Sequence, residues 1–86
     1  MYIILVYDIR EKRVATIMKI CRKYLKHIQN SVFEGELSSV NFKKLQIEIN
    51  KSIKVNEDSV IIYKLNNLKY TSKIELGVKK DTSNFI

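Results

Sequence analysis

An uninterrupted apolar run near the amino terminus constrains the fold most. Residues 2–7 read Tyr-Ile-Ile-Leu-Val-Tyr, and Asp8 ends the run. A run without polar alternation predicts a central strand that carries apolar side chains on both faces of a sheet. It is too short for a signal peptide or a membrane span, so we expect a cytoplasmic protein. With 86 residues in total, we expect a single domain over residues 1–86.

The rest of the chain alternates between helical and extended patterns. Apolar residues at positions 14, 17, 18, 21 and 25 share one helical face and predict a helix over about residues 10–26. Residues 28–37 read as extended, and Gly35 indicates a bulge or a close backbone approach. Asn30 and Ser31 can turn the chain there, so we favour two short antiparallel strands over one bent strand.

A second helix and two further strands follow. Apolar residues at positions 42, 45, 49 and 53 predict a helix over about residues 39–52, with Ser38 or Ser39 as its N-cap. The β-branched run at 59–65 predicts another central strand. Residues 73–78 predict a short last strand, and residues 79–86 form a polar tail.

This order predicts an α+β fold of the ferredoxin-like βαββαβ type with a short extra C-terminal strand. Two helices would cover one face of an antiparallel sheet. Because residues 2–7 are apolar on both faces, helices on one side leave hydrophobic surface on the other. A homodimer that packs sheet against sheet would bury that surface.

Positive charge is concentrated in the first predicted helix. The chain carries 16 Lys and Arg residues against 9 Asp and Glu residues, a net charge of +7. Between positions 10 and 26 a single acid, Glu11, stands against the cations Arg10, Lys12, Arg13, Lys19, Arg22, Lys23 and Lys26. Such a segment predicts contact with a polyanion such as nucleic acid. The alternative is an ordinary solvated surface rich in lysine.

The chain offers few catalytic groups. Cys21 lies on the apolar helix face, which favours a core thiol over a nucleophile, and a single cysteine fits a reducing compartment. His27, the single histidine, follows the basic helix and suits a cation at a helix C-terminus, with an acid–base role or an RNA contact as the alternative. Neither the Cys/His spacing of a metal site nor a glycine-rich phosphate loop is present.

Asp8 is the carboxylate placed best for chemistry. Asp8 and Glu11 have the spacing of a capping box, which predicts an N-cap for the first helix. The alternative is a metal ligand, because Mg²⁺ binds carboxylate and water oxygens. One carboxylate makes a poor site, but a twofold axis that brings two copies of Asp8 together would form a paired one. The two roles are compatible.

Three segments together resemble the CRISPR-associated protein 2 family, the small subunit of the spacer-acquisition machinery. They are Val6-Tyr7-Asp8, the run Gln-Asn-Ser-Val-Phe-Glu-Gly-Glu-Leu at 29–37 and the run Asp-Ser-Val-Ile-Ile-Tyr-Lys-Leu at 58–65. The resemblance implies two ferredoxin-like subunits packed through their sheets, with the last strand completing the partner's sheet edge. We place Ile74, Leu76 and Val78 in that exchange.

The resemblance also implies a site. Asp8 would be the catalytic residue and the ligand of Mg²⁺. The charge pattern adds Arg10, Arg13, Lys19 and Arg22 as nucleic-acid-binding cations. Of these, Arg13 matches a basic position of the family, although it could equally be a solvated helix cation, whereas Arg10 stands where many members have a small polar residue. Tyr7, Ser31 and Phe33 would lie near the cleft, with core positions as the alternative for the two aromatic residues. Glu34 and Glu36 would be extra ligands or would face solvent or a basic partner.

Two functions follow from the resemblance. The first is a Mg²⁺-dependent endonuclease that hydrolyses single-stranded RNA, double-stranded DNA or both. The second is a dimeric scaffold that supports a DNA duplex while the larger integrase subunit of the spacer-integrase complex performs the chemistry. A toxin-like ribonuclease of the same fold is a third alternative, and the Phe-Glu-Gly-Glu-Leu run at 33–37 counts against it.

Overall fold

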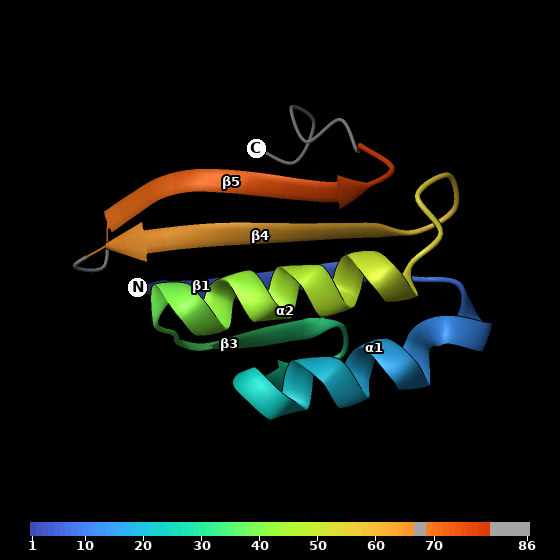
Figure 1. The fold of residues 1–86 in the computed structure, drawn as a ribbon, viewed down its shortest axis with the longest axis horizontal. Coiled ribbons are helices and arrows are strands. Elements are labelled where there is room, and N and C mark those ends of the chain that lie inside the picture. Colours follow the sequence, from blue (N-terminus) through green and yellow to red (C-terminus); the bar gives the residue numbers. More distant parts are fainter. Residues whose placement is uncertain (67–68, 80–86) are drawn as a thin grey trace.

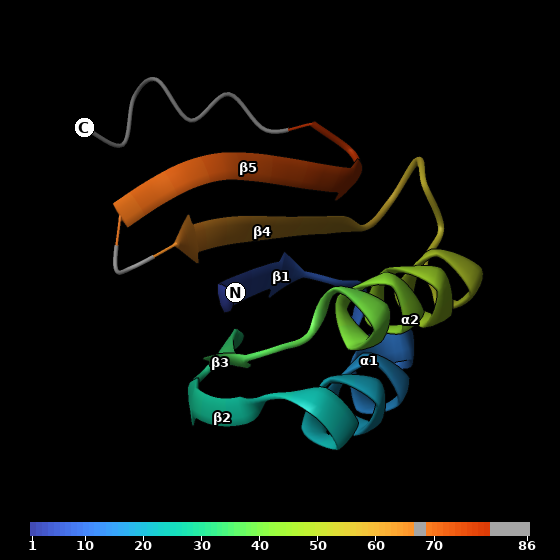
Figure 2. The same cartoon turned by 60° about the vertical axis from the view of Figure 1, so that its left-hand side comes forward.

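The computed structural model describes residues 1–66 and 69–79, in which the strands form one antiparallel sheet (Figure 1). The sheet order is β2-β3-β1-β4-β5. In chain order the elements are β1 (Tyr2–Asp8), α1 (Glu11–Tyr24), β2 (Lys26–Gln29), β3 (Val32–Glu36), α2 (Ser39–Ser52), β4 (Ser59–Asn66) and β5 (Lys69–Gly77). Both helices lie on one face of the sheet (Figure 2), which confirms the ferredoxin-like prediction.

Strand β1 lies at the centre of the sheet and divides its side chains between the two faces. Ile3, Leu5 and Tyr7 are buried toward the helices, whereas the residues between them are partly exposed. On this second face Val6 is paired with Val32 of β3 and with Ile61 of β4. The apolar character predicted for both faces is therefore present, and helices cover only one of them.

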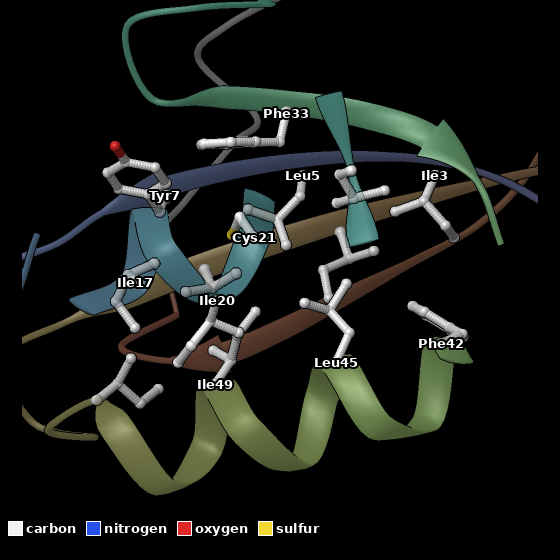
Figure 3. Packing of buried hydrophobic residues seen from close by; sticks show 14 of the residues in the cluster. Ile3, Leu5, Tyr7, Ile17, Ile20, Cys21, Phe33, Phe42, Leu45 and Ile49 are labelled. Carbon is white, nitrogen blue, oxygen red and sulfur yellow. The ribbon is translucent and has the colours of Figure 1, made fainter. Parts of the chain in front are cut away.

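The core lies between this sheet and the two helices (Figure 3). Helix α1 contributes Ile17, Ile20 and Cys21, and α2 contributes Phe42, Leu45 and Ile49. The side chain of Cys21 is fully buried, and burial raises the pKa of its thiol to about 12. The prediction that Cys21 is a core residue is confirmed, because a protonated, enclosed thiol is no nucleophile.

Helix α1 ends earlier than its apolar spacing predicts. It stops at Tyr24 because the next residues form β2, which pairs with β3. His27 therefore lies in a strand, and its predicted position at a helix C-terminus is wrong. The two-strand interpretation of this region is confirmed, with the turn at Asn30 in a left-handed conformation (φ 41°).

Gly35 marks a close approach rather than a bulge. The irregularity in this pair of strands lies between His27 and Gln29. A Cβ atom on Gly35 would lie 3.2 Å from Cδ2 of Leu25, at the junction of α1 and β2. The glycine thus allows this junction to pack against β3.

The last strand is longer than the predicted residues 73–78 and pairs with β4 of its own chain. Ile74 and Leu76 pack against the chain's own core, and their place at a partner's sheet edge stays a prediction. Val78 follows the strand, and its N–H donates to the carbonyl of Asp58 (2.8 Å). The predicted tail lies outside the described residues from position 80 onward. Within the described part, none of the helices has the length and hydropathy needed to cross a membrane.

Candidate functional site

Asp8 is the last residue of β1, and its side chain is exposed to solvent. The strand alternation puts it on the face away from the helices, with Ser59 opposite it in β4. The predicted N-cap role is wrong, because α1 is capped at Arg10 without any side-chain hydrogen bond. The carboxylate of Asp8 is therefore presented at a strand end on the uncovered face of the sheet.

A second aspartate anchors the segment that follows Asp8. Asp58 is fully buried just before β4, and its carboxylate accepts hydrogen bonds from two main-chain N–H groups. These belong to Arg10 (2.9 Å) and Lys54 (2.8 Å). In the sequence Asp58 is recognised only as the first residue of the run at 58–65, and this role is missed. The only signal was an acid directly before an apolar strand, and the partner at Arg10 is 48 positions away.

Arg13 completes this buried cluster. Its Nε lies 2.6 Å from Oδ2 of Asp58, and its terminal nitrogen lies 3.0 Å from Glu57. The side chain is only 15% exposed. These hydrogen bonds raise the pKa of Arg13 and hold the pKa of Asp58 well below its usual value. The prediction that Arg13 presents its charge outward to a phosphate is therefore corrected, because both acids neutralise it inside the protein.

The predicted cleft residues lie on the helix face of the sheet or at its rim. Phe33 is fully buried, Tyr7 is nearly so, and their ring centroids are 6.2 Å apart. Burial raises the pKa of the Tyr7 hydroxyl. Ser31 lies beside them, and its carbonyl accepts a hydrogen bond from the Tyr7 N–H (3.1 Å). Figure 3 shows both rings among the core side chains. They therefore lie on the helix-covered face of the sheet, opposite to the face that carries Asp8.

His27 belongs to the same edge of the sheet. Its ring stacks on Phe33 with centroids 4.6 Å apart, and its Nε2 lies 2.7 Å from the carbonyl oxygen of Asn30. This contact stabilises the β2–β3 turn. It gives His27 a structural role at the turn, distant from the face that carries Asp8.

The remaining cations predicted to bind nucleic acid are exposed. Arg10 precedes α1, and Lys19 and Arg22 lie on the outer surface of that helix. Arg10 lies beside an open hollow of about 660 Å³, whose other lining residues are Glu11, Lys12 and Glu57. Exposed side chains of this kind can neutralise phosphates without reading bases.

Within residues 1–66 and 69–79, the acids do not converge into a complete metal site. Among the residues that the structure describes, no group of three His, Cys, Asp or Glu side chains is placed to hold an ion. Glu34 accepts a hydrogen bond from the Tyr2 hydroxyl, and Glu36 pairs with the amino group of Met1 (2.5 Å). Both lie toward the opposite end of β1 from Asp8. Asp8 supplies an oxygen donor of the type that Mg²⁺ accepts.

Comparisons with known proteins agree with this fold and identify the family. The family model described as "CRISPR associated protein Cas2" matches residues 1–73. A protein of Thermotoga maritima named "CRISPR-associated endoribonuclease Cas2" is 51% identical and covers 100% of this chain and 99% of its own length. A protein of the same name from Fusobacterium nucleatum is 45% identical and covers 100% of this chain and 87% of its own length.

Solved structures show the same arrangement. The structure entitled "Crystal structure of cas2" superposes with a TM-score of 0.71 at 34% identity, covering 96% of this chain and 91% of that chain. The Streptococcus pyogenes Cas2 structure gives a TM-score of 0.71 at 28% identity, covering 77% of this chain and 87% of that chain. The chain therefore belongs to the CRISPR-associated protein Cas2 family, and the expectation of a nuclease from a CRISPR system is confirmed at the level of that family.

Proposed function

We propose that the protein is a metal-dependent endoribonuclease that acts as a homodimer, with Asp8 as its catalytic residue. One observation carries this proposal: an exposed carboxylate ends the central strand on the face that the helices leave open. That face is apolar at Val6, Val32 and Ile61, so a second copy of the chain is the natural cover for it. A twofold arrangement would bring two Asp8 carboxylates to one shared site.

The residues of such a dimer have distinct roles. The paired Asp8 carboxylates would hold Mg²⁺, which when bound lowers the pKa of a water molecule and offsets phosphate charge. Arg10, which is exposed two residues after Asp8, would contact a neighbouring phosphate. The names of the relatives support RNA as the substrate. Double-stranded DNA is the alternative substrate, because phosphate contacts alone do not distinguish the two.

The test is the Asp8→Ala substitution. We expect Mg²⁺-dependent cleavage of single-stranded RNA to fall at least about 100-fold, because the ligand pair that orients the attacking water is lost. Dimerisation should persist, as measured by analytical ultracentrifugation. The matched control is Glu11→Ala, which removes an exposed acid three residues further along the chain and should retain cleavage. Unchanged cleavage by the Asp8→Ala protein would rule out the proposed role.

A second candidate function rests on the outer surface of α1. Lys19 and Arg22 are exposed there, one helical turn apart, and exposed cations of this kind suit a DNA backbone. In this alternative the dimer is the core of the spacer-integrase complex, and the larger integrase subunit performs the chemistry. It predicts that Asp8→Ala retains spacer acquisition, whereas Lys19→Glu with Arg22→Glu impairs it. Acquisition that is unaffected by the double reversal would contradict the scaffold function.

A further inference from the structure

We infer that Asp58 is a positioning residue for Asp8, whose buried carboxylate fixes the turn from β1 into α1 and thereby the direction in which the Asp8 side chain leaves the sheet. This inference rests on the proposed nuclease function. It assigns to Asp58 a role in the reaction without any contact to substrate. The argument begins with the main chain on either side of Asp8.

Two consecutive residues where β4 begins hold the segment from Asp8 to Arg10, one at each end of the segment. Asp8 is the register partner of Ser59 in β4. Two residues later the N–H of Arg10 donates to Oδ1 of Asp58 (2.9 Å). Ile9 between them is largely buried in the core. The chain leaves β1 at Asp8 and enters α1 at Glu11 under these constraints, so little freedom remains for the Asp8 main chain.

The carboxylate that makes this contact is itself rigidly held. Its Oδ2 accepts from the N–H of Lys54 (2.8 Å) and from Nε of Arg13 (2.6 Å), and the terminal nitrogen of Arg13 reaches Oδ1 (3.0 Å). Its main-chain carbonyl accepts from Val78 at the end of β5. A fully buried anion with several donors is fixed in position, and it transmits that position to Arg10.

This contact matters for chemistry because catalytic geometry tolerates little displacement. A shift of about 1 Å at a reacting group can reduce a rate about 100-fold even when binding is retained. Two of the three exposed cations that would bind nucleic acid, Lys19 and Arg22, lie in the later turns of α1, where Ile17, Ile20 and Cys21 anchor the helix in the core. Loss of the Asp58 contact should therefore change the rate constant much more than the affinity.

The experiment compares Asp58→Asn with Glu57→Gln and Asp8→Asn in Mg²⁺-dependent cleavage of single-stranded RNA, with rates normalised to the folded fraction. An asparagine side chain has nearly the same shape as aspartate, but its NH2 group donates and cannot accept from Arg13 or from the main-chain N–H groups. The substitution therefore breaks the contact that holds the Arg10 N–H with little change in shape. We expect kcat of Asp58→Asn to fall about 10- to 100-fold with KM changed less than about twofold. Glu57→Gln leaves the Arg10 N–H contact intact and removes only the charge beside the Arg10 side chain (3.7 Å), so its kcat should stay within about twofold of wild type.

Each outcome is decisive. If folded Asp58→Asn cleaves with wild-type kcat, or if its loss only matches its unfolded fraction, the positioning role is wrong and Asp58 serves folding alone. If Asp8→Asn cleaves like wild type, the proposed function fails instead. If Asp58→Asn does not fold, hydrogen exchange of the wild-type dimer decides: strong protection of the Arg10 amide supports the anchor, and exchange at the rate of an unstructured peptide overturns it.

Discussion

Two aspartates with opposite surroundings define the candidate site at the scale of single residues. Asp8 is exposed at the end of β1, whereas Asp58 is enclosed and bound by Arg10, Arg13 and Lys54. The position of Asp8 at a strand end could be predicted from the apolar run before it. The cluster around Asp58 could not, because its hydrogen bonds to Arg10 and Arg13 join residues that are 48 and 45 positions apart, and only the bond from Lys54 is local.

The same cluster predicts how stability depends on pH. Hydrogen bonds from Arg13, and then from the two main-chain N–H groups, hold the pKa of Asp58 below its usual value in the folded chain. The folded state thus binds this proton more weakly than the unfolded state, where the pKa is about 3.9. The stabilisation is complete above that pH and is lost as the pH falls toward the lower folded pKa. We expect the free energy of unfolding to decrease between about pH 5 and pH 2, and less steeply in Asp58→Asn.

Urea unfolding at a series of pH values and one fixed protein concentration measures this difference, because dimerisation would otherwise shift the apparent stability. At neutral pH the Asp58→Asn protein should already be less stable by about 3 kcal/mol, since Arg13 loses its buried partner. Equal slopes for the two proteins in the acid range would show that Asp58 is not the group that titrates.

At the scale of elements, periodicity identified each helix and strand but placed their ends less well. The helix over residues 39–52 matches α2, whose N-cap Ser38 accepts a hydrogen bond from the Asn41 N–H (3.1 Å). In α1 the apolar spacing continues through Leu25, which is buried at the junction of α1 and β2 rather than in the helix. A residue can be buried in the core whether it belongs to the end of a helix or to the segment that leads into a strand. A hydrophobic pattern alone therefore cannot show where the helix ends and the strand begins.

The end of β5 depends on a single glycine. Gly77 has φ +82°, and a Cβ atom there would lie 2.1 Å from the carbonyl oxygen of Asp58. We expect Gly77→Ala to reduce the free energy of unfolding by about 2 kcal/mol, because the residue is strained and the Val78–Asp58 hydrogen bond is displaced. Thermal and urea unfolding measure the loss.

Gly35→Ala is the matched control for this substitution. Its added methyl group would meet the flexible end of the Leu25 side chain at 3.2 Å, and its backbone is not in the left-handed region. We expect a loss of no more than about 1 kcal/mol there. A Gly77→Ala protein as stable as Gly35→Ala would show that the close approach to Asp58 is readily relieved.

At the scale of the whole molecule, the apolar face of the sheet that no helix covers is the feature that points to assembly with a second chain. Its existence could be predicted from residues 2–7, because a strand that is apolar on both faces needs cover on both. The face of the sheet on which each side chain of β1 lies could not be predicted from the apolar run, because the run shows no polar alternation. Tyr7 and Asp8 are adjacent in the sequence, yet the alternation of the strand separates them onto opposite faces.

The uncovered face therefore makes the last prediction, which concerns assembly. Val6→Glu would place a charge at the centre of this face, between Val32 and Ile61. If two chains pack through it, the dissociation constant of the dimer should rise about 100-fold, since burial of one unpaired charge costs at least about 3 kcal/mol. Val40→Glu is the control, because Val40 is 62% exposed on α2 on the opposite side of the molecule. Sedimentation equilibrium should show a weakened dimer for Val6→Glu alone. A Val6→Glu protein that dimerises as tightly as wild type would mean that the two Asp8 carboxylates do not meet across this face, and the paired metal site would lose its structural basis.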